Sequence, residues 1–310
     1  IQKSVGRLDL YQRTPPWIVP KPDRAISAVE RRLFKRLPLL QDAFRKAIYW
    51  MLEARVVGFT VQPRLMKLFE AVARAHIRRQ VPDPALRAKL TPDYTIGCKR
   101  ILISDDYYPA LSKANVEVVT DGIREIRAHS IVTADGTERP VDAIIWGTGF
   151  HATDPLPRGA IFGRNGVDIL DAWKDGAEAY KGTTVAGFPN LFLITGPNTG
   201  LGHSSMVFMI ESQVRYILGA LKLMQEKDLA TVEVDADAQA RWNTGLKGKL
   251  DGAVWSIGGC RSWYVDAKGR NVTLWPGATW AFRLATRTFD AEHYALGHRT
   301  VVDESVAAAS

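Results

Sequence analysis

The sequence contains no G-x-G-x-x-G segment among its 310 residues. That glycine spacing forms the tight turn that holds the pyrophosphate of a dinucleotide at the start of a helix, so the usual cradle for this group is absent from these residues. No G-x-S-x-G segment occurs either, which argues against a serine hydrolase of the α/β type.

Long hydrophobic runs are also absent. The richest apolar stretch, residues 47–61, is interrupted by Glu53 and Arg55. A membrane-spanning helix needs roughly 18 or more consecutive apolar residues, so we expect no transmembrane segment.

Cysteine is scarce, with only Cys98 and Cys260 in the chain. Their spacing matches no metal-ligand motif, C-x-x-C is absent, and two cysteines do not make a disulfide framework. We therefore expect no metal site, and we expect the reducing cytoplasm as the compartment.

Positive charge is in excess, with a formal net charge of +8, and it is concentrated in residues 21–100, which hold 18 Lys and Arg against 7 Asp and Glu. Such a segment could attract nucleic acid or an anionic membrane. It lacks the basic and aromatic interleaving that stacks bases. A solvated helical surface near an anionic ligand is therefore the favoured interpretation, and we expect no nucleic-acid partner.

Helical patterns fill residues 26–80, where Arg and Lys stand between apolar positions. Within residues 64–79 the spacing predicts an amphipathic helix. The residues that share its apolar face are Leu65, Leu68, Val72 and Ala75.

Strand-like segments flank the helical region. They are residues 7–14, 101–104, 116–119, 143–146 and 191–195. The last two are continuously apolar, as in the central strands of a parallel sheet. Asp135 and Gly136 predict a tight turn between two further strand-like runs. A glycine-rich loop and an amphipathic helix follow the last strand, which is the order of nucleotide-binding α/β folds. The sequence therefore predicts an α/β fold.

Arg13 and Thr14 stand at the end of the first predicted strand. In a dinucleotide-binding fold the residue at such a strand end meets the adenosine ribose, and an arginine there accommodates the 2′-phosphate of NADP. Taken alone, the pair is more simply interpreted as surface residues.

Lys99 and Arg100 directly precede an apolar run. Neighbours in an extended segment point to opposite sides, so the two cations are expected to face different targets. One would join Arg13 on a phosphate, and the other would point into a reaction site. The alternative is surface ion pairing with Asp105 or Asp106.

Gly147 and Gly149 flank Thr148 after the predicted strand at 143–146. The two glycines permit either a close approach of the backbone to a ligand or a tight turn. The turn is the simpler interpretation.

The loop at 196–206 precedes a predicted helix, which Ser204 or Ser205 could cap. The N-terminus of that helix would stabilise negative charge, such as that of a reduced flavin. His203 is either a base or, more simply, a loop histidine with satisfied hydrogen bonds. The aromatic segment at 260–277 is interpreted, taken alone, as a structural cluster.

In combination, these segments resemble the C-terminal part of a Baeyer–Villiger-type flavin-dependent monooxygenase, a family related to the flavin-containing monooxygenases. The segments that carry the resemblance are YQRTPPWIVP (11–20), GCKRILISDDYY (97–108), DAIIWGTGF (142–150), GFPNLFLITGPN (187–198) and SWY (262–264).

The resemblance implies two dinucleotide-binding, Rossmann-like domains, both incomplete in this chain, with a helical insertion. Residues 1–25 and 91–145 would be the remainder of the NADPH-binding domain, and residues 26–90 the insertion. Residues 146–310 would be the C-terminal half of the FAD-binding domain. Because the family's glycine-rich loops would precede Ile1, we expect a fragment that is inactive alone.

The resemblance also implies a role for each matching residue. Arg100 would be the catalytic residue beside the flavin, although Gly147 departs from the alanine that is common at its position. The cofactor-binding residues would be Arg13, Thr14 and Lys99 on the 2′-phosphate of NADPH, Trp263 on the same cofactor, and Gly147, Thr148, Gly149, Asn198 and Met206.

The implied activity is the insertion of one oxygen atom from O2 into a ketone, which yields an ester or lactone through a peroxide formed on reduced FAD. Three alternatives remain open. They are oxygenation of a nitrogen or sulfur atom, a disulfide- or ferredoxin-type reductase, and a basic module that binds nucleic acid or lipid without catalysis. The missing redox cysteine pair counts against the reductase.

Overall fold

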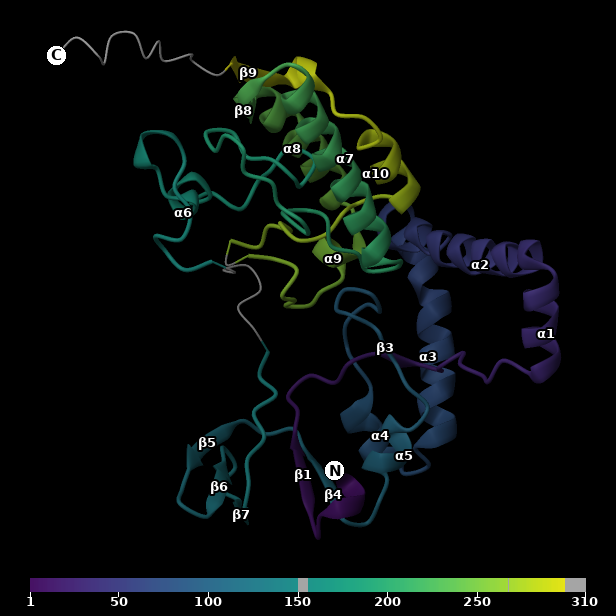
Figure 1. Cartoon of the computed structure of the whole chain (residues 1–310). Helices are drawn as coiled ribbons and strands as arrows, with labels where there is room; N and C mark the ends of the chain where they lie inside the picture. The colour runs from purple at the N-terminus through teal and green to yellow at the C-terminus, as the bar shows by residue number, and fades with distance from the viewer. Residues whose placement is uncertain (150–155, 267, 299–310) are drawn as a thin grey trace, which may run out of the picture. The chain divides into compact units, whose positions relative to one another are not determined.

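The computed structural model describes residues 1–149, 156–266 and 268–298 (Figure 1). The chain divides into two compact units. Unit 1 comprises Ile1–Phe44, Gln62–His151 and Ile257–Ser262, and unit 2 comprises Arg45–Val61, Ala152–Ser256 and Trp263–Ser310. Each unit contains helices and strands.

Two pairs of parallel strands organise unit 1. β1 (Leu8–Tyr11) pairs with β4 (Val116–Val119), with Leu8 opposite Val116. This confirms the strands predicted at 7–14 and 116–119. β2 (Ile18–Val19) pairs with β3 (Leu102–Ile103). The strand predicted at 101–104 therefore exists, although both of its residues are exposed.

The core of unit 1 lies between these strands and three helices, α3 (Met66–Gln80), α4 (Pro84–Leu90) and α5 (Tyr107–Leu111). The fully or nearly fully buried residues that form it are Ile18, Ile77, Val81, Leu90, Tyr108, Leu111 and Val118.

Helix α3 confirms the predicted helix, but the predicted apolar face is wrong. Leu68 and Val72 are 68% and 52% exposed. The residues that α3 buries are Met66, Ala73, His76 and Ile77. Both stripes are apolar at helical spacing, and only the position of the strands beside α3 decides which one is covered.

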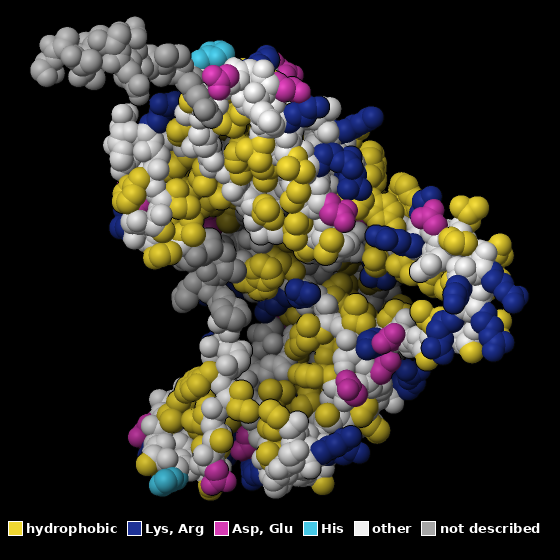
Figure 2. Space-filling model, in the orientation of Figure 1, with side chains coloured by type: hydrophobic (Ala, Val, Ile, Leu, Met, Phe, Trp, Pro, Cys, Tyr) yellow, Lys and Arg dark blue, Asp and Glu magenta, His cyan; other side chains and the backbone are white. Residues whose placement is uncertain are grey.

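Helix α1 (Ala28–Arg36) begins with a capping box, in which the Ser27 side chain accepts from the Glu30 N–H and the Glu30 carboxylate accepts from the Ser27 N–H. α2 (Pro38–Glu53) follows, and it ends at the only buried residue of the two helices, Glu53. Figure 2 shows Lys and Arg side chains gathered over α1. The basic segment is thus a solvated helical surface over this stretch, as predicted.

A three-stranded antiparallel sheet follows β4 in the chain. Its strands are β5 (Ile123–Ile126), β6 (Ser130–Thr133) and β7 (Glu138–Pro140). Gly136, with a φ of 89°, makes the turn between β6 and β7 that Asp135 and Gly136 predict. The Asp135 carboxylate accepts from the Thr137 N–H and from two hydroxyl groups, which keeps the turn closed.

The parallel strands predicted at 143–146 and 191–195 are absent, because neither segment is paired in a sheet. Ile145 is 74% exposed and Trp146 is 65% exposed. A parallel strand exists only through hydrogen bonds to its neighbours. No strand among the described residues lies against these two segments to supply those bonds.

Unit 2 is built on the long helix α7 (Met206–Glu226), which confirms the helix predicted after the glycine-rich loop. It packs against the antiparallel strands β8 (Leu229–Val234) and β9 (Tyr294–His298) and against α10 (Thr279–Ala285). Helix α8 (Ala236–Leu250) lies between β8 and α9 (Val254–Ile257) in the chain. The remaining short elements are η1 (Gln2–Ser4), η2 (Val57–Val61), η3 (Pro63–Leu65), η4 (Arg164–Gly166), α6 (Ile169–Ala172) and η5 (Ala291–His293).

A partly buried carboxylate, that of Asp290, joins the parts of unit 2. Asp290 accepts hydrogen bonds from the hydroxyl groups of Tyr180 and Tyr216, and from the Lys181 ammonium group at 2.7 Å. These partners hold the pKa of Asp290 below its ordinary value, although burial acts in the opposite direction as the largest single influence.

The two cysteines of the chain are joined in unit 1. Cys98 and Cys260 form a disulfide with a Cα–Cα distance of 6.1 Å. The scarcity of cysteine had suggested no disulfide framework, and pairing over 162 positions leaves no local signal in the sequence.

Among the described residues, no cluster of metal-ligating side chains is present. No helix in that part of the chain has the length and apolarity needed to cross a bilayer.

Candidate functional site

Tyr94 brings two of the predicted site segments together in unit 1. Its main-chain oxygen accepts from the Trp17 indole N–H at 2.8 Å, and its hydroxyl group donates to the Pro15 carbonyl at 3.2 Å. Burial raises the pKa of Tyr94 to about 12, so the hydroxyl group remains a donor at neutral pH. The strand end after β1 is thereby tied to the loop that leads to Lys99.

Lys99 lies against the same tyrosine. Its side-chain nitrogen is 4.9 Å from the centre of the Tyr94 ring, a distance at which the ring attracts a cation. Burial lowers the pKa of Lys99, and Asp93 opposes this shift only in part. The ammonium group therefore faces a half-buried position where an added negative charge would be favourable.

Arg100 is exposed, in contrast to its neighbour, so the two cations do have different surroundings. Neither residue makes an ion pair with Asp105 or Asp106, and the alternative interpretation is wrong for the described structure. Asp105 instead accepts from the Lys21 N–H, and Asp106 accepts from the Ser104 hydroxyl group.

Arg13 and Thr14 follow β1 and are both exposed. The residue before them, Gln12, continues the strand pairing through a hydrogen bond from its N–H to the Val119 carbonyl. The side-chain amide of Gln12 accepts from Tyr107, but its NH2 group is buried without a partner among the described residues. A donor that is orphaned beside an exposed arginine suits an anionic ligand.

Gly147, Thr148 and Gly149 are exposed and lie outside regular secondary structure. Gly149 has a φ of 94°, which a residue with a side chain rarely adopts. No described atom lies within 4 Å of the position that a side chain of Gly147 or Gly149 would occupy. The segment is therefore open on that side, and Phe150, which completes the motif, lies outside the described residues.

Asn198 is buried in unit 2 and organises the loop that precedes α7. Its side-chain NH2 donates to the carbonyl groups of Asn271 and Leu274, at 2.9 and 3.1 Å. Its backbone has a φ of 55° and donates to Val272. The Asn198 side chain, predicted to bind the cofactor, thus already donates to two carbonyl groups of the protein. Its role toward a ligand would therefore be to hold the loop before α7 in place.

Met206 is the first residue of α7. Ser205 occupies the N-cap position but makes no side-chain hydrogen bond to the helix, so the predicted serine cap is absent. The hydroxyl group of Ser204 is buried and has no partner among the described residues. No side chain therefore caps the first N–H groups of α7. Uncapped N–H groups at a helix N-terminus can donate to a ligand that carries negative charge.

His203 is not the satisfied loop histidine that the sequence favours. Its side chain is fully buried and both ring nitrogens lack hydrogen bonds, while Nε2 lies 3.8 Å from a carboxylate oxygen of Glu53. Burial lowers the pKa of His203, so the ring is neutral at pH 7. The Glu53 carboxylate accepts hydrogen bonds from the N–H and the hydroxyl group of Thr279, both at 2.8 Å.

Trp263 is about half exposed, and its ring centre lies 4.4 Å from that of Tyr264. Asn198, Met206 and Trp263 belong to unit 2, whereas the strand-end and Lys99 segments belong to unit 1.

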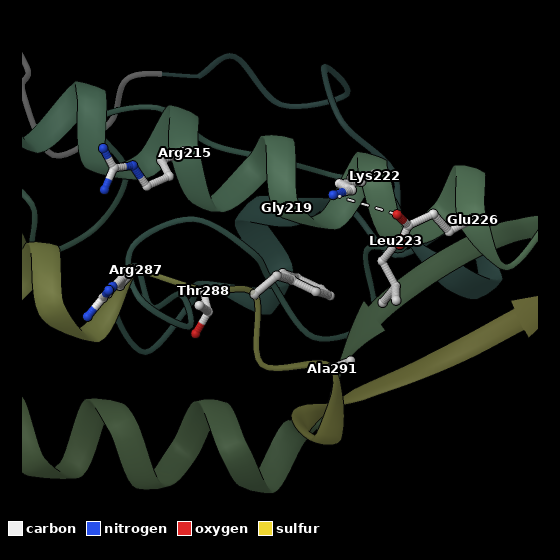
Figure 3. A pocket seen from close by; sticks show the side chains of 9 residues that line it. Arg215, Gly219, Lys222, Leu223, Glu226, Arg287, Thr288 and Ala291 are labelled. Atoms are coloured by element: carbon white, nitrogen blue, oxygen red, sulfur yellow. Dashed lines mark ion pairs between the residues drawn. The ribbon is translucent and has the colours of Figure 1, made fainter.

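A surface pocket lies elsewhere in unit 2 (Figure 3). It has a volume of about 380 Å³ between α7 and residues 287–291, and Arg215 and Arg287 flank it. None of the predicted site residues lines it.

Sequence reasoning missed Tyr94, Glu53 and the disulfide. Each acts through a partner that is far away in the sequence: Pro15 and Trp17 for Tyr94, Thr279 for Glu53, and Cys260 for Cys98. Glu53 did carry one signal, because a lone carboxylate inside an apolar stretch must find a partner if it is buried.

Comparison with known proteins gives a consistent result. No protein-family model matches the chain. A Baeyer–Villiger monooxygenase of Pseudomonas aeruginosa is 62% identical over 297 residues, which are 96% of this chain and 56% of that protein. A Baeyer–Villiger monooxygenase of Streptomyces coelicolor is 47% identical over 95% of this chain and 57% of that protein. The chain thus spans little more than half the length of these curated relatives.

Solved structures share the fold. Cyclohexanone monooxygenase from Rhodococcus sp. Phi1 bound to NADP+ has a TM-score of 0.79 at 22% identity, over 96% of this chain and 64% of that one. A structure of OTEMO in complex with FAD and NADP has a TM-score of 0.79 at 22% identity, over 96% of this chain and 63% of that one. The chain therefore has the predicted α/β fold, and this fold matches a part of each of these structures. Over nearly its whole length, this chain is therefore similar to a part of these Baeyer–Villiger monooxygenases.

Proposed function

We propose that the whole protein is an FAD- and NADPH-dependent monooxygenase that inserts one oxygen atom of O2 into a small-molecule ketone. The observation that carries the proposal is the 62% identity to a Baeyer–Villiger monooxygenase over 96% of this chain. The chain itself would supply the residues that hold NADPH and face the flavin, and would be inactive alone.

The proposed domain division follows the resemblance. Residues 1–25 and 91–145 would belong to the NADPH-binding domain, and residues 26–90 to a helical insertion. Residues 146–310 would form the C-terminal half of the FAD-binding domain. Both nucleotide-binding domains would be Rossmann-like and would be completed by residues outside this chain.

Arg13, Thr14 and Lys99 would hold the 2′-phosphate of NADPH. Three features of unit 1 support this assignment. Arg13 makes no ion pair among the described residues, the buried NH2 group of Gln12 beside it lacks an acceptor, and Tyr94 ties the strand end to the loop of Lys99. A guanidinium group matches two phosphate oxygens, and an ammonium group adds a point charge. Trp263, half exposed, would contact the same cofactor.

Arg100 would be the catalytic residue. FAD, when bound and reduced by NADPH, supplies the activation of dioxygen. Arg100 would supply a permanent positive charge, because arginine does not lose its proton in proteins. That charge would stabilise the oxyanion that develops on the ketone oxygen during the reaction. Its exposure and its freedom from ion pairs in the described structure leave it available for this role.

The flavin side of the site would be formed by Asn198, Met206 and the segment Gly147, Thr148 and Gly149. Asn198 shapes the loop before α7 through its bonds to residues 271–274. Met206 begins the helix whose first N–H groups no side chain caps. These uncapped groups and the buried, unpartnered hydroxyl group of Ser204 fit a cofactor that carries negative charge when reduced.

Oxygenation of a nitrogen or sulfur atom is the second candidate, because the same cofactors support it. The permanent charge of Arg100 favours the ketone reaction, in which an oxyanion must be stabilised. We propose no nucleic-acid partner, since the cations of α1 form an ordinary exposed helix surface. We also propose the cytoplasm as the compartment, because cysteine is scarce in the sequence.

The test uses the whole protein that contains these residues. It is purified with its flavin, and NADPH oxidation is followed with cyclic ketones, linear ketones, amines and sulfides as substrates. We expect NADPH oxidation to be coupled to ester or lactone, which gas chromatography would detect. Coupling to sulfoxide or hydroxylamine alone would favour the second candidate, and failure to bind flavin would contradict both.

A further inference from the structure

We propose that Cys98 and Cys260 are a redox-sensitive pair whose disulfide holds the loop of Lys99 and Arg100 in the conformation that binds NADPH. The proposal rests on the function proposed above, and it adds a modification site that controls it.

The disulfide connects two segments that each lead into the proposed site. Cys98 immediately precedes Lys99 and Arg100, and Cys260 stands three residues before Trp263. Beside the disulfide, the Thr95 N–H donates to the Gly258 carbonyl at 3.0 Å. The loop of the two cations is therefore joined to residues 257–262 by a covalent bond. The hydrogen bond from Thr95 to Gly258 connects the same two segments.

The surroundings of the two sulfur atoms differ. Cys98 is fully buried, with 0% of its surface exposed, whereas Cys260 is partly exposed. A reagent from solvent therefore reaches Cys260 first. The thiolate is the form that reacts, and access from solvent favours reaction at Cys260.

The compartment makes a permanent disulfide the less favoured interpretation. Disulfides of cytoplasmic proteins are usually transient and catalytic or redox-sensing, because cellular thiols keep cysteines reduced. A single pair that joins two segments of a cofactor site fits that description better than it fits a structural framework.

The chemistry balances with a peroxide as oxidant. The Cys260 thiolate attacks one peroxide oxygen, so that an S–O bond forms, the O–O bond breaks, and one water leaves after protonation. The Cys98 thiolate then attacks the resulting sulfenic acid, which forms the S–S bond and releases a second water. Two thiols lose two electrons in total, and hydrogen peroxide gains them. A dithiol reductant reverses the change by attack on the Cys260 sulfur, which releases Cys98 as the thiol.

Opening the disulfide would release the loop without removing any residue that contacts NADPH. The long side chain of Lys99 and the backbone of its loop would then have to be ordered when NADPH binds. This ordering typically weakens binding by a small factor for each side chain, so we expect the KM for NADPH to rise roughly five- to tenfold. The flavin content and the rate at saturating NADPH would change little.

The experiment uses the whole, flavin-loaded protein. One sample is treated with dithiothreitol, and a second is reduced, freed of dithiothreitol and reoxidised with an equimolar amount of hydrogen peroxide. Peptide mass spectrometry after thiol alkylation records whether Cys98 and Cys260 are linked, and steady-state kinetics gives the KM for NADPH. The matched control is the Cys98→Ser, Cys260→Ser double variant, which receives both treatments.

We expect the link in the reoxidised sample only, a lower KM there, and a double variant that resembles the reduced sample and ignores both treatments. Should the double variant not fold, the two wild-type samples still decide the matter. An equal KM with and without the link would overturn the proposal and leave the proposed function intact. A disulfide that dithiothreitol does not open would overturn it too. Failure of both samples to oxidise NADPH would contradict the proposed function, while the mass spectra would still report the redox behaviour of the pair.

Discussion

The side-chain nitrogen of Lys99 lies 4.9 Å from the centre of the Tyr94 ring, and the hydroxyl group of that ring donates to the Pro15 carbonyl. One tyrosine thus connects the loop of Lys99 to the strand end that carries Arg13 and Thr14. The two predicted phosphate-binding segments are 85 or more residues apart in the chain, and this connection supports the proposal that they form one site.

Removal of the Tyr94 ring should weaken NADPH binding, whereas loss of its hydroxyl group alone should mainly affect stability. We expect Tyr94→Phe to lower the free energy of unfolding by about 1 kcal/mol, since one hydrogen bond is lost. Tyr94→Leu should also raise the KM for NADPH by roughly two- to fivefold, because the ring no longer attracts the Lys99 cation. Urea unfolding and steady-state kinetics measure the two effects. Equal KM values for the two variants would contradict a role for the ring.

Lys99→Ala should reduce the preference for NADPH over NADH. Loss of a charge-assisted contact of roughly 1.5–3 kcal/mol corresponds to a rise of the NADPH KM by about one to two orders of magnitude. The KM for NADH, which lacks the 2′-phosphate, should change little. If both KM values rose by the same factor, Lys99 would not face that phosphate.

The pH dependence of NADPH binding should also report Lys99. Because burial lowers the pKa of Lys99, its ammonium group loses the proton at a lower pH than an ordinary lysine does. As the pH rises, the affinity for NADPH should therefore begin to fall before an exposed lysine would titrate. In Lys99→Arg this loss should disappear, since arginine keeps its charge. Fluorescence titrations with NADPH between neutral and alkaline pH provide the measurement.

Arg100→Ala in the whole protein should lower the rate of ester formation by about two to three orders of magnitude, as expected when a charge that stabilises an oxyanion is removed. The KM for NADPH should change far less than in Lys99→Ala. Arg287→Ala, a change at an exposed arginine of the surface pocket, serves as the control and should leave the rate intact. Product formation and NADPH oxidation are measured side by side, and an unchanged product rate in Arg100→Ala would refute its catalytic role.

Glu53→Gln should destabilise unit 2. The buried carboxylate accepts two hydrogen bonds from Thr279, and an amide would place an NH2 donor where two donors already point. We expect the free energy of unfolding to fall by about 1–3 kcal/mol, the cost of a buried group left without its partner. Thr279→Ser, which keeps both donors, is the matched control. Denaturant unfolding monitored by tryptophan fluorescence distinguishes the two variants.

His203 should make the protein less stable in acid. Burial lowers the pKa of His203 in the folded state below its ordinary value of 6.5, so below pH 6.5 the unfolded chain binds a proton that the folded chain does not. Stability is therefore lost as the pH falls from about 6.5 toward the lowered pKa. His203→Asn should show a smaller decrease in melting temperature over this range. The same change at the exposed His129 should not alter the decrease, and an identical profile for His203→Asn would contradict the prediction.

The sequence by itself determined the features that depend on neighbours in the chain. The spacing of apolar residues placed α7, and the aspartate and glycine at 135 and 136 placed the turn between β6 and β7. Short runs of strand-forming residues placed β1 and β4. The order of five motifs was enough to indicate the family that the relatives represent, although each motif is weak alone.

Only the tertiary structure decided which side chains meet. It covered Ile77 and left Leu68 exposed on the same helix, paired Cys98 with Cys260, and set Lys99 against Tyr94. It also left 143–146 and 191–195 without sheet partners, although both are apolar enough for a strand. The physical reason is the same in each case. Burial, disulfide pairing and parallel-strand pairing are interactions between segments that are distant in the chain, and a local pattern states what a segment can do but not which segment it will meet.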